Sequence, residues 1–194
     1  MRSVGQEQGA AFEGEALVVW ARVGGRPAFL AALHHTASPF GPFVEIVAGE
    51  FRSRPGLRPR LRQTTLAVSG GPAKEVGAAA AALMWWADEP LREVRWEERQ
   101  FRLRAEAKRV AVPALVPSDL LHPGWAGAET EHARRLPAKV HLARIEIDVP
   151  ADDELARFAG RRSGFLVTTA SQIGGEAWLH LVRTLRVPAA AEGT

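Results

Sequence analysis

A single carboxylate stands inside an apolar segment, where it could act as an acid or a base. Glu45 lies in the run FVEIVA, and in a β-strand it shares a face with Phe43 and Val47. A carboxylate in this position either faces solvent at the edge of a sheet or lies in a cavity, where burial raises its pKa. A carboxyl group transfers protons most effectively when its pKa lies near the operating pH. We therefore take Glu45 as the candidate catalytic residue and Phe43 as a candidate ligand contact.

An arginine interrupts a second apolar segment, WLHLVRTL. In a strand, Arg183 shares a face with Leu181 and Leu185. A buried arginine needs an acidic partner, and Glu45 could supply it, which would make Arg183 a ligand-binding residue. The alternative is an aliphatic stem that carries the charge to the edge of the sheet. Both interpretations remain open.

One stretch of the chain is strongly basic. Between Glu50 and Glu75 there is no acidic residue, while the stretch contains five arginines and one lysine. Arg58, Arg60 and Arg62 follow a Pro-Gly turn and could bind an anion or a nucleic acid. Only Phe51 could add the aromatic stacking typical of nucleic-acid binding. The pattern favours a solvated hairpin.

Several kinds of chemistry are excluded or disfavoured by the composition. The chain has no cysteine, so disulfides and thiolate catalysis are excluded. It also has no phosphate-binding loop of the Walker type and no H-E-x-x-H motif. His34 and His35 are adjacent, which places them on opposite faces of a strand or about 100° apart on a helix, so a metal would need at least one ligand from elsewhere. We predict no metal and no cofactor.

The balance of charge does not indicate a nucleic-acid-binding protein. The sequence pI is about 10.1, yet the formal net charge is only +3. The pI is high because the chain has no Cys or Tyr to titrate between histidine and lysine. No segment resembles a signal peptide or a membrane span. We therefore expect a cytoplasmic protein.

The elements that must position these residues are mainly strands. Apolar or alternating segments predict strands over 16–23, 43–48, 61–69, 140–149, 165–170 and 177–187. The alternation from Arg92 to Arg104 indicates a hairpin or a bent strand with a solvated face. Residues 117–138, rich in Pro, Gly and His, are expected to form a long irregular segment.

Three helices are predicted between these strands. Pro27 suits the first turn of a short helix over PAFLAALHH. The alanine-rich segment 73–87 predicts the longest helix, and Pro150 with Asp152 starts a short one over 151–159. Strands outnumber helices and the crossovers are few, so we predict an antiparallel-dominated α+β fold. Its core would be a cone-like barrel or a strongly curved sheet with a few packed helices.

The segment Ser38-Pro-Phe-Gly-Pro-Phe-Val-Glu45 resembles the G-P-Y-x-E strand of the acetoacetate decarboxylase family. The strand TTLAVS, the turn GGPAKEV and the helix expected from Gly77 follow at spacing similar to the family's G-R-E-x-W-G-x-P-K region. The block HLARIEIDVPADDELARFAGRRSGFLVTT resembles the family's C-terminal strands. The resemblance implies one domain over 16–187, with a flexible segment at 1–15 and a flexible tail at 188–194.

The resemblance also implies a buried ligand cavity, homo-oligomers and a role for Glu45 in placing substrate or proton. It does not carry over the family's catalytic lysine, because Trp85 stands at the aligned position. An indole cannot form the imine that a desolvated amine forms. Trp85 either fills the core at the end of the predicted helix or lines the cavity that the lysine would occupy.

Two functions from different classes follow. The first is a diverged acetoacetate decarboxylase-like protein that binds a small carbonyl or carboxylate compound without imine catalysis. A Glu45-assisted lyase or isomerase reaction remains open. The alternative is a non-enzymatic module that binds an anion or nucleic acid through Arg58, Arg60 and Arg62. Binding to phosphates would weaken steeply with salt, whereas binding in a cavity would not.

Overall fold

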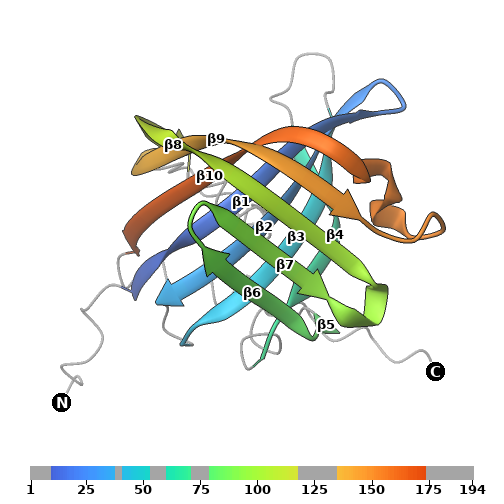
Figure 1. The fold of residues 1–194 in the computed structure, drawn as a ribbon, viewed down its shortest axis with the longest axis horizontal. Helices are drawn as coiled ribbons and strands as arrows, with labels where there is room; N and C mark the ends of the chain where they lie inside the picture. The colour runs from blue at the N-terminus through green and yellow to red at the C-terminus, as the bar shows by residue number, and fades with distance from the viewer. Residues whose placement is uncertain (1–9, 38–40, 53–59, 71–78, 118–134, 174–194) are drawn as a thin grey trace, which may run out of the picture.

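The computed structural model describes residues 10–37, 41–52, 60–70, 79–117 and 135–173. These residues form ten strands and two short 3-10 helices (Figure 1). The strands are β1 (Ala10–Val23), β2 (Arg26–Ala37), β3 (Phe43–Arg52), β4 (Arg60–Val68), β5 (Ala79–Ala80), β6 (Leu83–Asp88), β7 (Leu91–Trp96), β8 (Phe101–Pro117), β9 (Arg135–Asp148) and β10 (Gly160–Ile173). The helices are η2 (Glu97–Arg99) and η4 (Glu154–Phe158).

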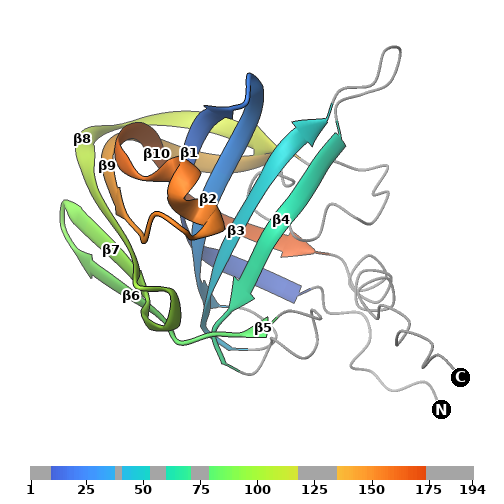
Figure 2. The same cartoon turned by 90° about the vertical axis from the view of Figure 1, so that its right-hand side faces the viewer.

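All ten strands belong to one sheet, in the order β5-β4-β3-β2-β1-β10-β9-β8-β7-β6. Neighbouring strands are antiparallel except for the short parallel pair of β4 and β5. The sheet curves so strongly that β6 and β7 lie across from β2 and β3 (Figures 1 and 2). The predicted fold class, a strongly curved and nearly closed antiparallel sheet with few helices, is confirmed.

Alternating side chains divide between the two faces of this sheet. The concave face holds the larger core, in which Leu17, Leu30 and Ile46 are fully buried. The convex face carries a second buried cluster that includes Val18 and Val47. Because both faces of β1, β2 and β3 are covered, these strands are apolar at nearly every position rather than at every second one.

The concave core is completed by η4. Leu155 and Phe158 of this helix are fully buried there. The Asp153 carboxylate accepts a hydrogen bond of 2.7 Å from the backbone N–H of Leu155, which caps the first turn. The short helix predicted over 151–159 is thus confirmed in position and is of the 3-10 type.

The helix predicted over 73–87 is wrong for the residues that the structure describes, because Leu83–Asp88 form a strand paired with β7. Leu83 is buried and Trp85 packs against the concave core, whereas Trp86 is exposed. This alternation of inward and outward side chains, with a period of two residues, is typical of a strand. The local helix preference of the alanines is overridden by cross-strand pairing.

The short helix predicted after Pro27 is also wrong, because Arg26–Ala37 form β2. Gly24 and Gly25 have positive φ values of 55° and 78° and form the tight turn of the β1–β2 hairpin. The continuous apolar run that follows reflects burial on both faces of the sheet rather than the periodicity of a helix.

The remaining predicted elements are found where the structure describes them. Predicted strands 16–23, 43–48, 61–69, 140–149 and 165–170 coincide with β1, β3, β4, β9 and β10. The hairpin expected over 92–104 is formed by β7, η2 and β8. Of the irregular segment expected over 117–138, residues 135–138 belong to β9, and residues 118–134 lie outside the described residues, as does the strand expected over 177–187. None of the described helices has the length and apolar character needed to cross a membrane.

Candidate ligand pocket

A pocket of about 190 Å³ opens on the concave face of the sheet. It lies where the β6–β7 turn approaches β1, β10, β9 and an irregular part of β8. Its lining combines several charged side chains with a small apolar floor: Glu15, Glu89, Pro90, Arg92, Ala107, Lys108, Arg109, His141, Leu166 and Thr168.

The central ion pair of the pocket joins two strands that are not neighbours in the sheet. Arg92 of β7 donates from Nε to Glu15 Oε2 at 2.7 Å and from Nη2 to Glu15 Oε1 at 2.8 Å. Its Nη1 donates to the carbonyl of Leu91 at 3.0 Å. The Arg92 side chain is only 5% exposed, so the two-pronged pairing supplies the partner that a buried guanidinium requires. The hydrogen bond to Glu15 raises the pKa of Arg92, against the opposing effect of burial.

Glu89 is a second partner of the same guanidinium. Its Oε1 accepts a hydrogen bond of 2.5 Å from Arg92 Nη2. The hydrogen bond and the charge of Arg92 lower the pKa of Glu89. Unlike Glu15, whose side chain is 19% exposed, the Glu89 side chain is 79% exposed. Arg92 is therefore shared between one enclosed carboxylate and one that stands in solvent.

Two further cations reach the pocket because β8 is irregular. The pairing of β8 with β9 shifts register between Ala107 and Ala111, and such a bulge redirects the side chains within it. Lys108 and Arg109 lie in this bulge and line the pocket. His141 Nδ1 donates to the Lys108 carbonyl at 2.8 Å, which leaves its Nε2 as the other ring nitrogen available to a ligand.

His34 and Trp85 extend the polar array along the concave face. His34 lies directly across from Glu15 in the β1–β2 ladder. A Cβ atom at Gly14 would lie 2.1 Å from the His34 carbonyl oxygen, so glycine permits this close pairing. The His34 ring stacks on Trp85 with centroids 5.3 Å apart. Burial lowers the pKa of His34, against the opposing effect of Glu15.

Trp85, a predicted ligand contact, is thus placed inside the curved sheet. It packs against the concave core and contacts His34, but it does not line the pocket. Its Nε1 is buried and has no hydrogen-bond partner.

Glu45 and Phe43 lie on the opposite face of β3, together with Val47 of the convex cluster. Glu45 is 1% exposed, and β3 lies between β2 and β4 rather than at an edge. The alternative of a solvated edge position is therefore wrong, because strands on both sides enclose Glu45. Its Oε2 lies 3.5 Å from Nε2 of His35, whose ring stacks on Phe43 with centroids 4.1 Å apart. The structure brings Glu45 and Phe43 together and separates them from Trp85 by the thickness of the sheet.

The other predicted site residues lie wholly or partly outside the described residues. Arg183 and Arg58 belong to segments that the structure does not describe. Arg60 and Arg62 lie on β4, where their backbones pair with Arg52 and Glu50 of β3. Their side chains lie outside the part of the protein that the structure describes.

Sequence reasoning missed the pocket residues Glu15, Arg92 and His141. We assigned the charges of 92–104 to a solvated face, yet Arg92 is buried. One signal was present in the sequence, because a strand over 91–96 places Arg92 on the same face as Val94 and Trp96. Within the described part of the chain, no group of three or more His, Asp or Glu side chains could hold a metal ion.

Comparisons with known proteins find similarity in structure alone. No family model matches the chain, and no curated protein matches it. The enduracididine biosynthesis enzyme MppR complexed with pyruvate has a TM-score of 0.50 at 12% identity, over 89% of this chain and 90% of that one. An acetoacetate decarboxylase-like enzyme from Sphingomonas wittichii RW1 has a TM-score of 0.47 at 11% identity, over 86% and 90%. At 12% identity, the similarity to MppR shows a shared fold and no more.

Proposed function

We propose that this protein is a diverged acetoacetate decarboxylase-like protein that binds a small carbonyl or carboxylate compound in the Arg92 pocket. The observation that carries the proposal is the net charge of the side chains that line this pocket. Three cationic side chains, Arg92, Lys108 and Arg109, line it against two carboxylates, Glu15 and Glu89. With His141 neutral, one positive charge is left over, which favours an anionic ligand.

The size and remaining polar groups of the pocket fit a small molecule. A volume of about 190 Å³ is below the range of pockets that enclose drug-sized ligands. The Thr168 hydroxyl and the Nε2 atom of His141 can hydrogen-bond a carbonyl or carboxylate oxygen, and Leu166 and Ala107 offer apolar contact. MppR is described as complexed with pyruvate, and pyruvate combines both functional groups. It is therefore the first probe.

We propose that binding is not covalent. Lys108 is the only lysine in the lining of this pocket, and its side chain is exposed. An amine that forms imines efficiently is kept unprotonated by burial or by neighbouring cations in a dry site. Water has access to Lys108, and the position that the resemblance aligns with a catalytic lysine holds Trp85.

Pyruvate binding, followed by isothermal titration calorimetry and NMR, tests the proposal. We expect the wild-type protein to bind pyruvate and to show shifts of the His141 and Thr168 signals. R109Q should weaken binding severalfold because a lining cation is lost. R161Q is the matched control, since the Arg161 side chain is 90% exposed and outside the pocket. If the wild-type protein binds no small carboxylate, or if both variants bind as it does, the assignment of this pocket is wrong.

A Glu45-assisted lyase or isomerase reaction is a second candidate, favoured by the buried pairing of Glu45 with His35. This pair lies across the sheet from the Arg92 pocket, so it would act on a ligand bound at the convex face. Exchange of the pyruvate methyl protons in D2O, followed by NMR, reports proton transfer at the carbon next to the carbonyl. Exchange that the wild-type protein accelerates and E45Q does not would support this reaction. Equal exchange in both proteins and in buffer would exclude Glu45 from it.

A further inference from the structure

We propose that Glu89 occupies the place of a ligand carboxylate on Arg92, and that the preferred ligand of the pocket carries two acidic groups. One ligand carboxylate displaces Glu89, and the other lies against Lys108 and Arg109. This inference rests on the proposed function of the pocket and narrows its ligand class.

The two carboxylates on Arg92 differ in how they are held. Glu15 accepts two hydrogen bonds from Arg92 and is largely enclosed, whereas Glu89 accepts one and is 79% exposed. An exposed side chain in a turn exchanges its partner for water readily, and its ion pair contributes little to stability. Glu89 is therefore the partner of Arg92 that an incoming anion can replace, while Glu15 keeps the guanidinium in position.

The charge of the pocket changes when Glu89 leaves. Arg92, Lys108 and Arg109 then face only Glu15, so the excess rises from one positive charge to two. A ligand with one carboxylate balances half of this excess, whereas a ligand with two balances all of it. Among the described residues, no ion pair is found for Lys108 or Arg109, so these two cations at the bulge of β8 are available to the second carboxylate.

The available space limits the distance between the two acidic groups. A volume of about 190 Å³ is small for a ligand pocket. It favours a short aliphatic dicarboxylate over a long one. Succinate is therefore the test ligand, and propionate is its monocarboxylate counterpart.

Calorimetric titration of succinate and propionate into three proteins tests the inference. We expect the wild-type protein to bind succinate severalfold more tightly than propionate, as one further ion pair with exposed cations would provide. If Glu89 occupies Arg92 for about nine-tenths of the time, E89Q should bind both ligands about tenfold more tightly than the wild-type protein. E106Q removes the same charge from an exposed glutamate that is outside the pocket lining, and we expect wild-type affinities.

A double variant separates the two subsites. K108Q/R109Q should weaken succinate binding more than propionate binding, so that the preference for succinate over propionate is lost. Both side chains are exposed, so folding should be preserved.

The outcomes distinguish this inference from the proposed function. If pyruvate binds and E89Q has the same affinities as E106Q, Glu89 does not compete with the ligand and the inference is wrong. The diacid preference is wrong if succinate and propionate bind equally to the wild-type protein. Failure of all three acids to bind to the wild-type protein and to E89Q would overturn the proposed function itself.

Discussion

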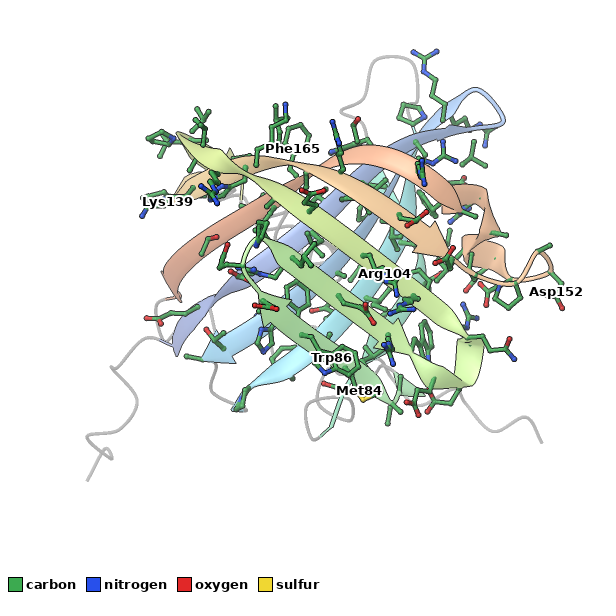
Figure 3. All side chains as sticks on the ribbon, in the orientation of Figure 1. Met84, Trp86, Arg104, Lys139, Asp152 and Phe165 are labelled. Carbon is green, nitrogen blue, oxygen red and sulfur yellow. The ribbon has the colours of Figure 1, made fainter. Side chains whose placement is uncertain are left out.

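At the scale of single residues, the sheet holds carboxylates in sharply different surroundings. Glu93 on the convex side of β7 accepts hydrogen bonds from Arg95, Arg102 and Arg104. Figure 3 shows Arg104 on β8, beside the strand that carries Glu93. Burial opposes the ionisation of Glu93, but the hydrogen bonds from Arg102, Arg95 and Arg104 outweigh it and lower its pKa to about 2.

This lowered pKa predicts a pH-dependent contribution of Glu93 to stability. A carboxyl whose pKa is lower in the folded state stabilises the protein above its unfolded pKa, and the stabilisation is lost as pH falls toward the folded pKa. We expect E93Q to lower the free energy of unfolding by about 1–2 kcal/mol at pH 7. Between pH 4.5 and pH 2 the difference from the wild-type protein should disappear.

Chemical denaturation at several pH values measures this difference. E106Q is the control, because Glu106 is an exposed glutamate on the next strand, and its effect should stay small throughout. If E93Q is as stable as the wild-type protein at pH 7, the hydrogen bonds from the three arginines to Glu93 do not stabilise the folded protein.

At the scale of elements, η4 fills part of the concave core. The helix that we predicted from the alanine run is not formed by Leu83–Asp88, which are a strand. Phe158 has no exposed surface, and its guanidinium neighbour Arg157 lies over the Phe158 ring at 5.2 Å. Arg157 also donates to Glu50 of β3 and to Thr64 of β4. A segment of five residues thus connects the core to two strands.

The burial of Phe158 predicts a large loss of stability on truncation. We expect F158A to lower the free energy of unfolding by about 3–5 kcal/mol, because it removes apolar contacts and leaves a cavity. F165A is the control, since Phe165 is 36% exposed on the outer surface (Figure 3), and it should cost clearly less than F158A, about 1–2 kcal/mol. Equal losses for the two variants, measured by urea denaturation, would contradict the role of η4.

The elements also show which sequence signals were reliable. Alternation and most of the apolar runs located strands, because each strand is buried on one face or on both, but the apolar run of β2 was interpreted as a helix. The alanine run misled us, since helix preference is a local property and the pairing of β6 with β7 depends on residues further along the chain. The Arg92 pocket could not be predicted, because Arg92 meets Glu15 only when the whole sheet curves. The residues next to Arg92 and Glu15 in the sequence do not indicate that these two side chains meet.

At the scale of the whole molecule, the composition limits the number of lysines that could form an imine with a substrate. The chain contains three lysines, Lys74, Lys108 and Lys139. Of these, Lys108 lines the pocket, Lys139 is exposed on β9, and Lys74 lies outside the described residues. A single experiment can therefore examine every lysine side chain that could form an imine with a ketone.

We expect no stable adduct when the protein is incubated with acetoacetate or pyruvate and reduced with borohydride. Imine formation at a useful rate needs an unprotonated amine in a dry site, and the two described lysines are exposed. Intact mass spectrometry measures the result. A stoichiometric adduct that is absent from K108Q would make Lys108 a nucleophile and refute non-covalent binding.

The strand order has a consequence for synthesis on the ribosome. The sheet consists of two contiguous halves, with residues 10–80 forming β1–β5 and residues 83–173 forming β6–β10. They are joined by the ladder between β1 and β10, the first and the last strands of the described chain. During translation, the edge of β1 that pairs with β10 therefore stays without this partner until β10 has been made. An unpaired edge of this kind invites pairing with other nascent chains, so we expect the growing protein to be prone to aggregation until β10 is available.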